Sequence, residues 1–471
     1  MFNQFTDLSR IHFVGIGGAG MSGIAEILVD YDQAQLTVSG CDLALSEVTA
    51  RLKWLGVNVH QGHSPDHLDG VDLVVISSAV AESNAEVREA RRRGITVVRR
   101  AEMLGELMRL KYGIAVAGTH GKTTTTSLIG TLLTDAGLDP TVIVGGRLRL
   151  LGTGARLGKS QYMVAEADEF DRSFLRLTPV TAVITTIDRD HLDTYKDLEA
   201  IKDAFVEFAG RVPFFGRLIV CLDDPNVRHI LPRLADRRIV TYGFSSGADL
   251  SAANVEPGPW GTRFVVRSLR GGELGEILLP VPGRHNVLNA LAAVGVGLSL
   301  RLEFAAIARA LAGFGGVHRR FENLGTWRGA MVVDDYAHHP TEVAATLAAA
   351  RQTFPQGRVL AVFQPHLFSR TLDQAEAFGS ALLGADLAII NDVYASRESP
   401  IPGVTGELVA DAARQAGHTN VRYCPRWQDA EALLAAEVKP GDVILTLGAG
   451  DVNRLASALV EQAERAGEAT P

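Results

Sequence analysis

The sequence predicts an α/β protein of three domains, each built on a mostly parallel sheet. Its 471 residues are about three times the roughly 150 residues of a typical domain. Short apolar runs alternate with segments of helical period along most of the chain. Strands that are apolar on both faces and separated by helices are typical of parallel sheets with both faces covered. We expect domains over residues 1–108, 109–317 and 318–471.

The first series of elements runs from Ile11 to about Met108. The apolar runs IHFVG, LTVSG, VNVH, DLVVIS and ITVV predict its strands, and MSGIAEILVD and NAEVREARRR predict two of its helices. This part of the chain is therefore expected to form a first α/β domain.

A second series begins with the strand IAVAG at Ile114. It continues through TVIVGG, QYMVAEA, TAVITTI and RLIVCL, with helices such as TSLIGTLLTDAG and LEAIKDAFVEFA between them. From Asp249 to Pro282, short strands punctuated by glycine and proline predict a small antiparallel sheet appended to this domain. Two helices, RHNVLNALAAVGVGLSL and FAAIARALAGF, complete it.

The stretch GFGGVHRRFENLG, which is Gly-rich and then charged, has the composition of a linker. A third series follows from Ala330, with the strands MVVDDYA, RVLAVFQ, LAIIND and VILTLG and with helices such as PTEVAATLAAARQTF and LDQAEAFGSALL. The third domain is therefore expected to be α/β as well.

The composition excludes several functional classes. Apolar residues make up 46% of the chain and charged residues 21%, which is too apolar for a disordered protein. Lys and Arg number 46 against 54 Asp and Glu, so the net charge of −8 gives no basic field for nucleic acid or an acidic membrane. Small-molecule chemistry is favoured, and no oligomeric state is predicted.

Cysteine content and the N-terminus both indicate a cytoplasmic protein. Cys41, Cys221 and Cys424 lie far apart, fit no metal-ligand spacing and are too few for a disulfide-stapled scaffold. The N-terminus lacks a basic start followed by an apolar stretch, and no window approaches the roughly 20 apolar residues of a membrane-spanning helix. We therefore expect neither export nor membrane insertion.

A strand runs through a Gly-rich turn into a helix at GTHGKTT, residues 118–124. Glycine permits close backbone approach, a helix N-terminus presents N–H groups, and Lys122 supplies a cation, which is what a terminal phosphate needs. Val116 occupies the first glycine position of the common pattern G-x-x-x-x-G-K-[ST], so this loop is a variant. Thr123 is the expected hydroxyl ligand of Mg²⁺. The alternative is an ordinary glycine turn with a solvated lysine.

The strand QYMVAEADEF ends in four acidic residues, Glu166, Asp168, Glu169 and Asp171. They fall at the carboxyl end of a parallel strand, where the ligands of open α/β sheets bind. Because carboxylates would repel a neighbouring triphosphate, the cluster favours divalent cations between them. The alternative is a solvated acidic loop. His191, at the next strand end in TTIDRDHLDTY, is either a further ligand of Mg²⁺ or Mn²⁺ or a capping residue.

Gly15–Gly20 form a full G-x-G-x-x-G after the strand IHFV, and Asp42 lies at the end of the next strand. This spacing is like that of a dinucleotide fingerprint. The glycines indicate only that a pyrophosphate can approach a helix N-terminus, and a nucleotide sugar also has a pyrophosphate. The spacing therefore leaves both ligands open, and Ser77–Val80 add hydroxyls at the same rim.

The third domain has polar side chains at two strand ends. VVDDYAHHPTE places there Asp335, Tyr336, His338 and His339. Adjacent histidines point in different directions, so at most one of them faces a site. Arg370, in FQPHLFSRT, could bind a carboxylate bidentately, and Arg320, in the linker, could reach a phosphate when the domains close. The alternative for both arginines is a solvated surface position.

Eight motifs in this order resemble the Mur ligases: GIGGAGMSGIAE, GTHGKTTTT, EADEFDRSF, IDRDHLDTY, RHNVLNALAA, HRRFE, DDYAHHPTEV and FQPHLFSRT. The resemblance extends from residue 11 to about residue 451. The resemblance implies a Rossmann-like N-terminal domain for a UDP-sugar, a central P-loop-type ATPase domain and a Rossmann-like C-terminal domain for an amino acid.

The resemblance is to those family members that attach L-alanine to UDP-N-acetylmuramate. It implies an ATP-dependent carboxylate–amine ligase of peptidoglycan precursor synthesis, which forms its amide bond through an acyl phosphate. ATP and Mg²⁺ or Mn²⁺ would be its cofactors, and UDP-N-acetylmuramate and L-alanine its small-molecule substrates.

Carried onto this sequence, the resemblance implies a role for each matching residue. ATP would be bound by Gly118, Thr119, His120, Gly121, Lys122, Thr123, Thr124, His285, Asn289, Arg320 and Asp335. The UDP-sugar would be bound by Gly15, Gly17, Gly18, Ala19, Gly20, Met21, Ser22, Asp42 and Ser78. The metal would be bound by Thr123, Glu166 and His191, and the amino acid by Tyr336, His338 and Arg370. Catalysis would depend on Lys122, Glu166, His191, Arg320 and His338, with His338 as the base because the ordinary pKa of imidazole is near 6.5.

One position departs from the family pattern. Many members have a basic residue after the PH of FQPH, where this chain has Leu367. Arg370 is then the remaining candidate on this segment for holding a carboxylate or phosphate of the substrate.

Four other functions fit part of the sequence. They are a ligase that attaches a preformed peptide to the same nucleotide sugar, a folate polyglutamylating ligase, a nicotinamide-dependent oxidoreductase built on Gly15–Gly20, and a non-catalytic nucleotide-binding switch. The oxidoreductase leaves GTHGKTT unexplained, and the folate ligase does not need the N-terminal glycine pattern.

Overall fold

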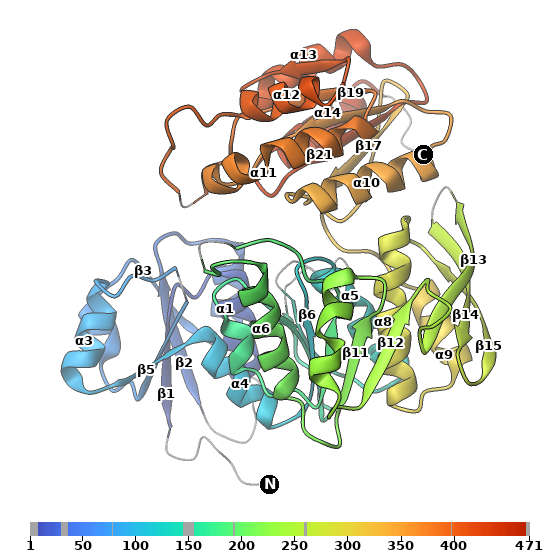
Figure 1. Cartoon of the computed structure of the whole chain (residues 1–471). Coiled ribbons are helices and arrows are strands. Elements are labelled where there is room, and N and C mark those ends of the chain that lie inside the picture. Colours follow the sequence, from blue (N-terminus) through green and yellow to red (C-terminus); the bar gives the residue numbers. More distant parts are fainter. Residues whose placement is uncertain are drawn as a thin grey trace. The chain divides into compact units, whose positions relative to one another are not determined.

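A computed structural model of the chain describes residues 8–29, 36–77, 79–144, 155–191, 194–258, 261–396 and 398–467. Three sheets with intervening helices follow one another along the sequence, as the α/β prediction requires (Figure 1). The chain divides into two compact units. The first comprises residues 1–253, 265–276 and 288–315, and the second residues 254–264, 277–287 and 316–471.

The N-terminal sheet has five strands in the order β3-β2-β1-β4-β5, and all its pairings are parallel. The five predicted strand runs are confirmed. The elements are β1 (Arg10–Val14), α1 (Ala19–Val29), β2 (Thr37–Asp42), α2 (Glu47–Trp54), β3 (Asn58–Gln61), the 3-10 helix η1 (Pro65–Leu68), β4 (Leu73–Ile76), α3 (Ala85–Arg93), β5 (Thr96–Arg99) and α4 (Arg100–Arg109).

Local sequence accounts for the ends of these helices. Helix α3 begins where the side chain of Asn84 accepts hydrogen bonds from the backbone of Glu86 and Val87, and it ends at Gly94 with φ of +71°.

Alternate residues of β1 pack on opposite faces of the sheet, since Ile11 and Phe13 belong to one buried cluster and Val14 to another.

The central sheet has ten strands in the order β15-β14-β13-β12-β11-β10-β6-β9-β7-β8. Its parallel part holds β6 between β10 and β9. Its elements are β6 (Tyr112–Ala117), α5 (Lys122–Asp135), β7 (Thr141–Ile143), β8 (Ala155–Arg156), β9 (Tyr162–Ala167), η2 (Ser173–Arg176), β10 (Thr181–Ile184), α6 (Leu198–Gly210), β11 (Arg217–Cys221), α7 (Pro225–Ile230), η3 (Leu231–Leu234), β12 (Ile239–Gly243), β13 (Leu250–Gly258), β14 (Gly261–Ser268), β15 (Gly272–Leu279), α8 (Arg284–Ser299) and α9 (Phe304–Ala312). The small antiparallel sheet expected after Asp249 corresponds to β13–β15, which extend the central sheet at one edge.

The C-terminal sheet has the order β16-β17-β21-β18-β19-β20, with β16 antiparallel to β17 and the other pairs parallel. Its elements are β16 (Glu322–Trp327), β17 (Ala330–Asp335), α10 (Pro340–Thr353), β18 (Val359–Phe363), α11 (Phe368–Ala381), η4 (Leu382–Gly384), β19 (Leu387–Ile390), α12 (Gly406–Gln415), β20 (Val421–Tyr423), α13 (Trp427–Glu437), β21 (Val443–Leu447) and α14 (Asn453–Arg465).

The linker prediction was wrong at its end. GFGGVHRRFENLG was interpreted as linker throughout, but its last residues form the start of β16. The charged Glu322 is buried there, because its carboxylate accepts the backbone N–H of Arg319 at 2.7 Å and lies 2.6 Å from Nδ1 of His318. Composition alone could not separate this edge strand from the linker before it.

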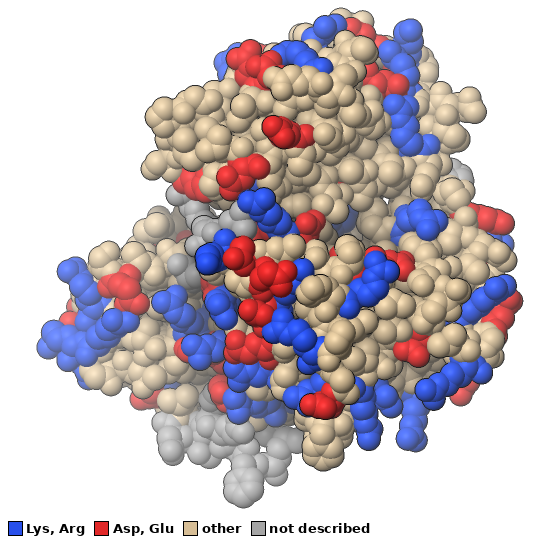
Figure 2. Space-filling model, in the orientation of Figure 1, with Lys and Arg blue, Asp and Glu red and all other residues tan. Residues whose placement is uncertain are grey.

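The surface agrees with the modest net charge. Acidic and basic side chains are interspersed over the face seen in Figure 2, without a large field of one sign. In the part of the chain that the structure describes, no helix is long and apolar enough to span a membrane.

Aromatic packing in the first unit gives a direct test of its core. Phe208 of α6 is fully buried, and its ring stacks on that of Phe174 with centroids 5.0 Å apart. We expect Phe208→Ala to lower the free energy of unfolding by roughly 3–5 kcal/mol, because transfer energy is lost and a cavity is left. The exposed Phe214 is the matched control, since its replacement should change stability by less than about 0.5 kcal/mol. Urea unfolding followed by circular dichroism would measure both, and equal shifts would contradict this core.

Candidate active site

The Gly-rich loop joins β6 to α5 in a conformation that needs its glycines. Gly118 and Gly121 have φ of +138° and +80°. A Cβ atom on Gly118 would collide with the hydroxyl of Thr185, and one on Gly121 would lie 2.5 Å from Oδ1 of Asn289. Helix α5 begins at Lys122 without a side-chain cap and without an acidic residue in its first turn. Its N-terminus can therefore donate backbone hydrogen bonds to an anion.

The loop is braced by the neighbouring strand end. The backbone N–H groups of Thr119 and His120 donate to the carbonyl and the hydroxyl of Thr186, both at 2.9 Å. The backbone N–H of Asp188 donates to Oγ1 of Thr119, also at 2.9 Å. These bonds fix the loop on the carboxyl edge of the sheet.

Lys122 is held by a buried carboxylate. Its ammonium lies 2.8 Å from Oε2 of Glu169, and the side chains of Lys122 and Glu169 are 12% and 2% exposed. Burial opposes the charge of Lys122, but Glu169, Asp168 and Glu166 outweigh it and raise the pKa of the lysine. Burial also raises the pKa of Glu169, and Lys122 opposes that shift. The lysine is thus held as a cation at the start of α5.

The predicted metal ligands lie in two adjoining groups. The hydroxyl of Thr123 donates to both carboxylate oxygens of Glu166, at 3.0 and 3.1 Å. His191 is grouped instead with Asp168 and Glu169, whose candidate ligand atoms all lie within 4.8 Å of one another. Glu166 is paired with Val116 of β6, which places its carboxylate beside the loop. A hydroxyl, carboxylates and one imidazole form a donor set that suits Mg²⁺ or Mn²⁺.

Asp188 is a residue that the sequence analysis did not single out. Its carboxylate lies 3.1 Å from Nε2 of His120, so it orients a side chain of the Gly-rich loop. The only signal in the sequence is its position directly after the strand TAVITTI, at the edge where Glu166 also lies.

Asn289 supports the loop from helix α8. It is buried, and the hydroxyl of Thr125 donates to its Oδ1 at 3.1 Å. His285 precedes it by one helical turn on α8. The contact of these two residues with ATP stays a prediction.

The N-terminal glycine loop is tied to the end of β2. The N–H groups of Gly15 and Ile16 donate to the carbonyl of Cys41 at 2.9 and 3.0 Å, and that of Gly17 donates to Oδ2 of Asp42 at 2.9 Å. Asp42 therefore holds the loop itself. Met21 and Ser22 lie buried in α1, whereas Ser78 lies outside the described residues.

The two linker arginines differ in their surroundings. The guanidinium of Arg319 binds Asp334 at 2.9 Å and donates to the carbonyls of Gly448 and Gly450, which joins the ends of two strands. Arg320 lies 3.6 Å from Glu342, and its side chain is more exposed than that of Arg319. Arg319 is therefore structural, and Arg320 is the candidate for a ligand.

Asp335 is a buried carboxylate at the end of β17. It accepts the N–H groups of Phe321 and Ala337 at 2.7 and 2.8 Å. Burial raises the pKa of Asp335 to about 6, against the effect of Arg320 and of these hydrogen bonds. Its carboxylate fixes the turn that leads to Tyr336 and His338.

His338, His366 and Arg370 lie close together in the second unit. The rings of His338 and His366 are 5.8 Å apart, and Nη1 of Arg370 lies 3.4 Å from Nδ1 of His366. Nδ1 of His338 lies 2.9 Å from the carbonyl of Tyr336, which can only accept, so this nitrogen carries a proton. His339 instead caps α10. The two adjacent histidines thus make different contacts.

Leu367 is the N-cap residue directly before α11, with φ of +71° and ψ of +133°. Its N–H donates to the carbonyl of Tyr394 at 3.0 Å, and the hydroxyl of Thr371 donates to its carbonyl at 2.7 Å. The side chain is buried rather than directed into solvent. The basic side chain of the family pattern is therefore replaced here by an apolar one.

Three protein-family models match successive parts of the chain. They are the Mur ligase family catalytic domain at residues 10–112, the Mur ligase middle domain at residues 116–297 and the Mur ligase glutamate ligase domain at residues 319–450. The chain belongs to the Mur ligase family. The first match includes Gly15–Gly20, so the nicotinamide alternative gains no support.

Individual Mur ligases are similar over nearly the full length. A UDP-N-acetylmuramate--L-alanine ligase of Salinibacter ruber (strain DSM 13855 / M31) is 51% identical over 463 residues, which cover 98% of this chain and 96% of the relative. One from Geobacter sp. (strain M21) is 51% identical over 449 residues, with coverages of 95% and 96%. The crystal structure of UDP-N-acetylmuramate-alanine ligase from Thermotoga maritima has a TM-score of 0.80 and 29% identity, covering 97% of this chain and 99% of that one.

The buried imidazole of His285 gives this Mur ligase a testable pH dependence. Burial, assisted by the positive charge of Arg320, lowers the pKa of His285 to about 4, whereas an unfolded chain has a value near 6.5. The unfolded state therefore binds more protons between these values, and the free energy of unfolding falls as the pH drops from about 6.5 towards 4. In His285→Gln this loss should be smaller by about 1–3 kcal/mol. Urea midpoints of both proteins between pH 4.5 and 7.5 would measure it, and parallel profiles would refute it.

Proposed function

We propose that this Mur ligase joins L-alanine to the carboxylate of UDP-N-acetylmuramate and hydrolyses ATP to ADP and phosphate in doing so. The observation that carries the proposal is the near-complete similarity, at 51% identity, to relatives that bear this activity in their names. The family is ATP-dependent, and the chain has a Gly-rich loop with a buried cation and an acidic strand end beside it. The reaction belongs to peptidoglycan precursor synthesis.

The chemistry explains why a phosphate loop serves an amide-forming enzyme. A carboxylate is a poor electrophile because its leaving group would be oxide. Transfer of the γ-phosphoryl group of ATP to the muramyl carboxylate creates an acyl phosphate, which the amine of alanine can attack with loss of phosphate. In this proposal Gly118–Thr124 bind the phosphates, and Lys122 exchanges part of its contact with Glu169 for the developing negative charge.

Thr123, Glu166 and His191 are proposed to hold Mg²⁺ or Mn²⁺, with Asp168 and Glu169 beside them. The hydroxyl–carboxylate contact and the cluster within 4.8 Å support this donor set. The cation would neutralise phosphate charge. Without a cation between them, the carboxylates would repel the phosphates of ATP.

The first domain is proposed to bind the UDP-sugar through Gly15, Gly17–Ser22 and Asp42, with Ser78 retained from the sequence prediction. The support is the preformed loop: Asp42 accepts the N–H of Gly17, and the carbonyl of Cys41 accepts the two preceding N–H groups. These bonds fix the loop in front of the first turn of α1, and the first N–H groups of a helix can bind a pyrophosphate.

Tyr336, His338 and Arg370 are proposed to line the alanine end, with His338 as the base that accepts a proton from the amine. Its Nδ1–H is directed at a carbonyl, so Nε2 is the nitrogen that can accept. Arg320, Asp335, His285 and Asn289 stay part of the proposed ATP site by family resemblance. A cytoplasmic location also stays part of the proposal, and the three unpaired cysteines are in keeping with it.

The function is tested by measuring phosphate release from ATP with UDP-N-acetylmuramate and single amino acids. We expect release to depend on L-alanine, with weaker or no release for other amino acids. A parallel reaction with a preformed tripeptide in place of alanine separates this activity from that of a ligase that attaches a peptide to the same nucleotide sugar. Release that is faster with the tripeptide, or that needs no amine at all, would overturn the proposal.

The same assay can follow the oxygen atoms. When the muramyl carboxylate carries ¹⁸O, one labelled oxygen should leave with the inorganic phosphate, because the acyl phosphate transfers that oxygen. Mass spectrometry of the phosphate measures this. Unlabelled phosphate in a reaction that forms product would exclude the acyl-phosphate route.

Lys122→Ala tests whether the loops at Gly118–Thr124 and Gly15–Gly20 bind different ligands. We expect the variant to lose turnover by at least about a thousandfold, because a cation at the transferred phosphoryl group is removed. The affinity for the UDP-sugar should change by less than about threefold, because this ligand is assigned to the loop at Gly15–Gly20. Calorimetric titration and the phosphate assay measure the two quantities. A similar loss in both would show that the sites are not separate.

A further inference from the structure

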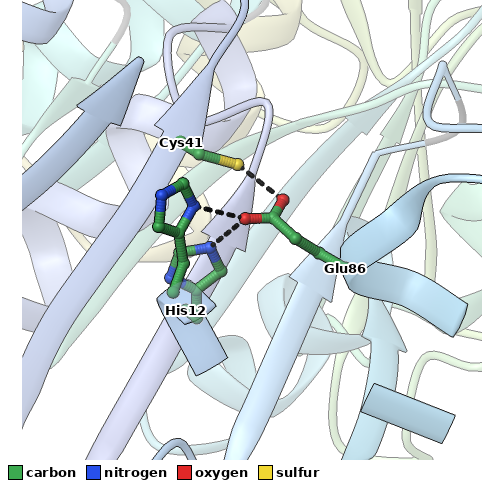
Figure 3. A group of neighbouring side chains, drawn as sticks. His12, Cys41 and Glu86 are labelled. Carbon is green, nitrogen blue, oxygen red and sulfur yellow. Dashed lines mark hydrogen bonds and ion pairs between the residues drawn. The ribbon is translucent and has the colours of Figure 1, made fainter. Parts of the chain in front are cut away.

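A cluster of four side chains, three of them buried, lies in the N-terminal domain next to the end of β2. Its members are His12 of β1, Cys41 of β2, His67 of η1 and Glu86 of α3. Their candidate ligand atoms all lie within 4.8 Å of one another. Figure 3 shows His12 and Cys41 both directed at the carboxylate of Glu86. The activity proposed above uses none of these four side chains.

We infer that His12, Cys41, His67 and Glu86 form a binding site for one divalent transition-metal ion of the zinc class. Two imidazoles, a thiol and a carboxylate are the ligand types that zinc takes, and a thiol with imidazoles disfavours Mg²⁺ and Ca²⁺. Four protein ligands without an open position are the arrangement of a structural site.

The distances between the candidate ligand atoms show how far these atoms would have to move to bind the ion. Sγ of Cys41 lies 2.8 Å from Oε2 of Glu86, Nδ1 of His67 lies 2.7 Å from Oε1, and Nε2 of His12 lies 3.5 Å from Oε1. Zn–N and Zn–S bond lengths place tetrahedral ligand atoms about 3.3–3.6 Å apart. These three pairs would have to change by under about 1 Å, and the remaining pairs, which lie within 4.8 Å, would have to close by up to about 1.5 Å.

The hydrogen bonds around His12 point to a missing cation. The hydroxyl of Ser39 donates to the carbonyl of Ile11 at 3.5 Å, so it accepts from Nδ1 of His12 at 2.9 Å. In the neutral tautomer with the proton on Nδ1, Nε2 is an acceptor, and it is buried without a hydrogen-bond partner among the described residues. Its neighbour is a carboxylate oxygen, another acceptor. A cation between the two satisfies both, and the bond to Ser39 orients the ring as a second-shell partner does.

Glu86 also needs a positive partner. Its carboxylate is fully buried, and in the described part of the chain its ion pairs are with histidines only, His12, His63 and His67. A buried carboxylate is stable as an anion only when positive charge or hydrogen-bond donors compensate it. Imidazolium formation at two of the histidines is the alternative to a metal.

The protonation of the Cys41 thiol and the partial exposure of two histidines also support a metal site. The thiol of Cys41 donates to Oε2 of Glu86 at 2.8 Å, so it carries its proton until a cation binds. Binding then breaks the S–H bond, forms a metal–sulfur bond and releases the proton to solvent. His67 and the adjacent His63 are 15% and 20% exposed in their side chains, so the cluster can be reached from outside. His60 stacks on His67 with ring centroids 4.1 Å apart, which fixes its orientation.

The experiment uses the full chain without an affinity tag, stripped of metal with a chelator and dialysed into excess Mg²⁺ to fill the nucleotide site. Zn²⁺ and Co²⁺ are then titrated separately. We expect one ion per chain, and with Co²⁺ the intense visible bands of a tetrahedral centre and a near-ultraviolet thiolate-to-cobalt charge-transfer band. The charge-transfer band identifies this cluster, because the proposed Mg²⁺ site has no cysteine.

Single substitutions show which side chains bind the metal. Cys41→Ser should abolish the charge-transfer band, and His67→Gln should weaken zinc binding at least about tenfold. Cys424→Ser removes a buried cysteine of the C-terminal sheet and should leave binding unchanged. Circular dichroism shows whether each variant folds. If Cys41→Ser does not fold, the zinc affinity of His67→Gln tests the site instead. The inference is overturned if the stripped wild type takes up no zinc, if cobalt is bound without a thiolate band, or if the folded ligand variants bind as the wild type does.

Discussion

The ion pair between Lys122 and Glu169 is the contact on which the central site depends. It joins the first residue of α5 to the segment after β9, and it is almost completely buried. A buried cation and a cluster of neighbouring carboxylates would each be unstable alone. Together they stabilise one another, so the cation is already positioned before a phosphate arrives.

Parallel strands bring the rest of that site to the same edge. The ends of β6, β9 and β10 are adjacent, and they contribute Gly118, Glu166 and Asp188 respectively. Hydrogen bonds from Thr119 and His120 to Thr186 then hold the loop on the neighbouring strand end. Residues about 70 positions apart in sequence thus meet because register and strand direction place them there.

The sequence predicted those parts that local pattern controls. The apolar runs located the parallel strands, and GTHGKTT located the turn into α5, because glycines and a helix start are local requirements. The different environments of Arg319 and Arg320 could not be predicted, because they arise from contacts with β17 and with the segment after β21. Asp188 and the edge strand β16 were missed for the same reason. Ligand spacing along the chain likewise says nothing about His12, Cys41, His67 and Glu86, which come from four separate elements.

The backbone of Leu367 is unfavourable by itself and is held by its neighbours. A branched residue with φ of +71° occupies a region that L-amino acids enter at a cost of about 1–3 kcal/mol. The bonds to Tyr394 and Thr371 offset that cost and hold the conformation in place. The chain therefore turns into α11, the helix that carries Arg370, through a strained residue where many proteins would have glycine.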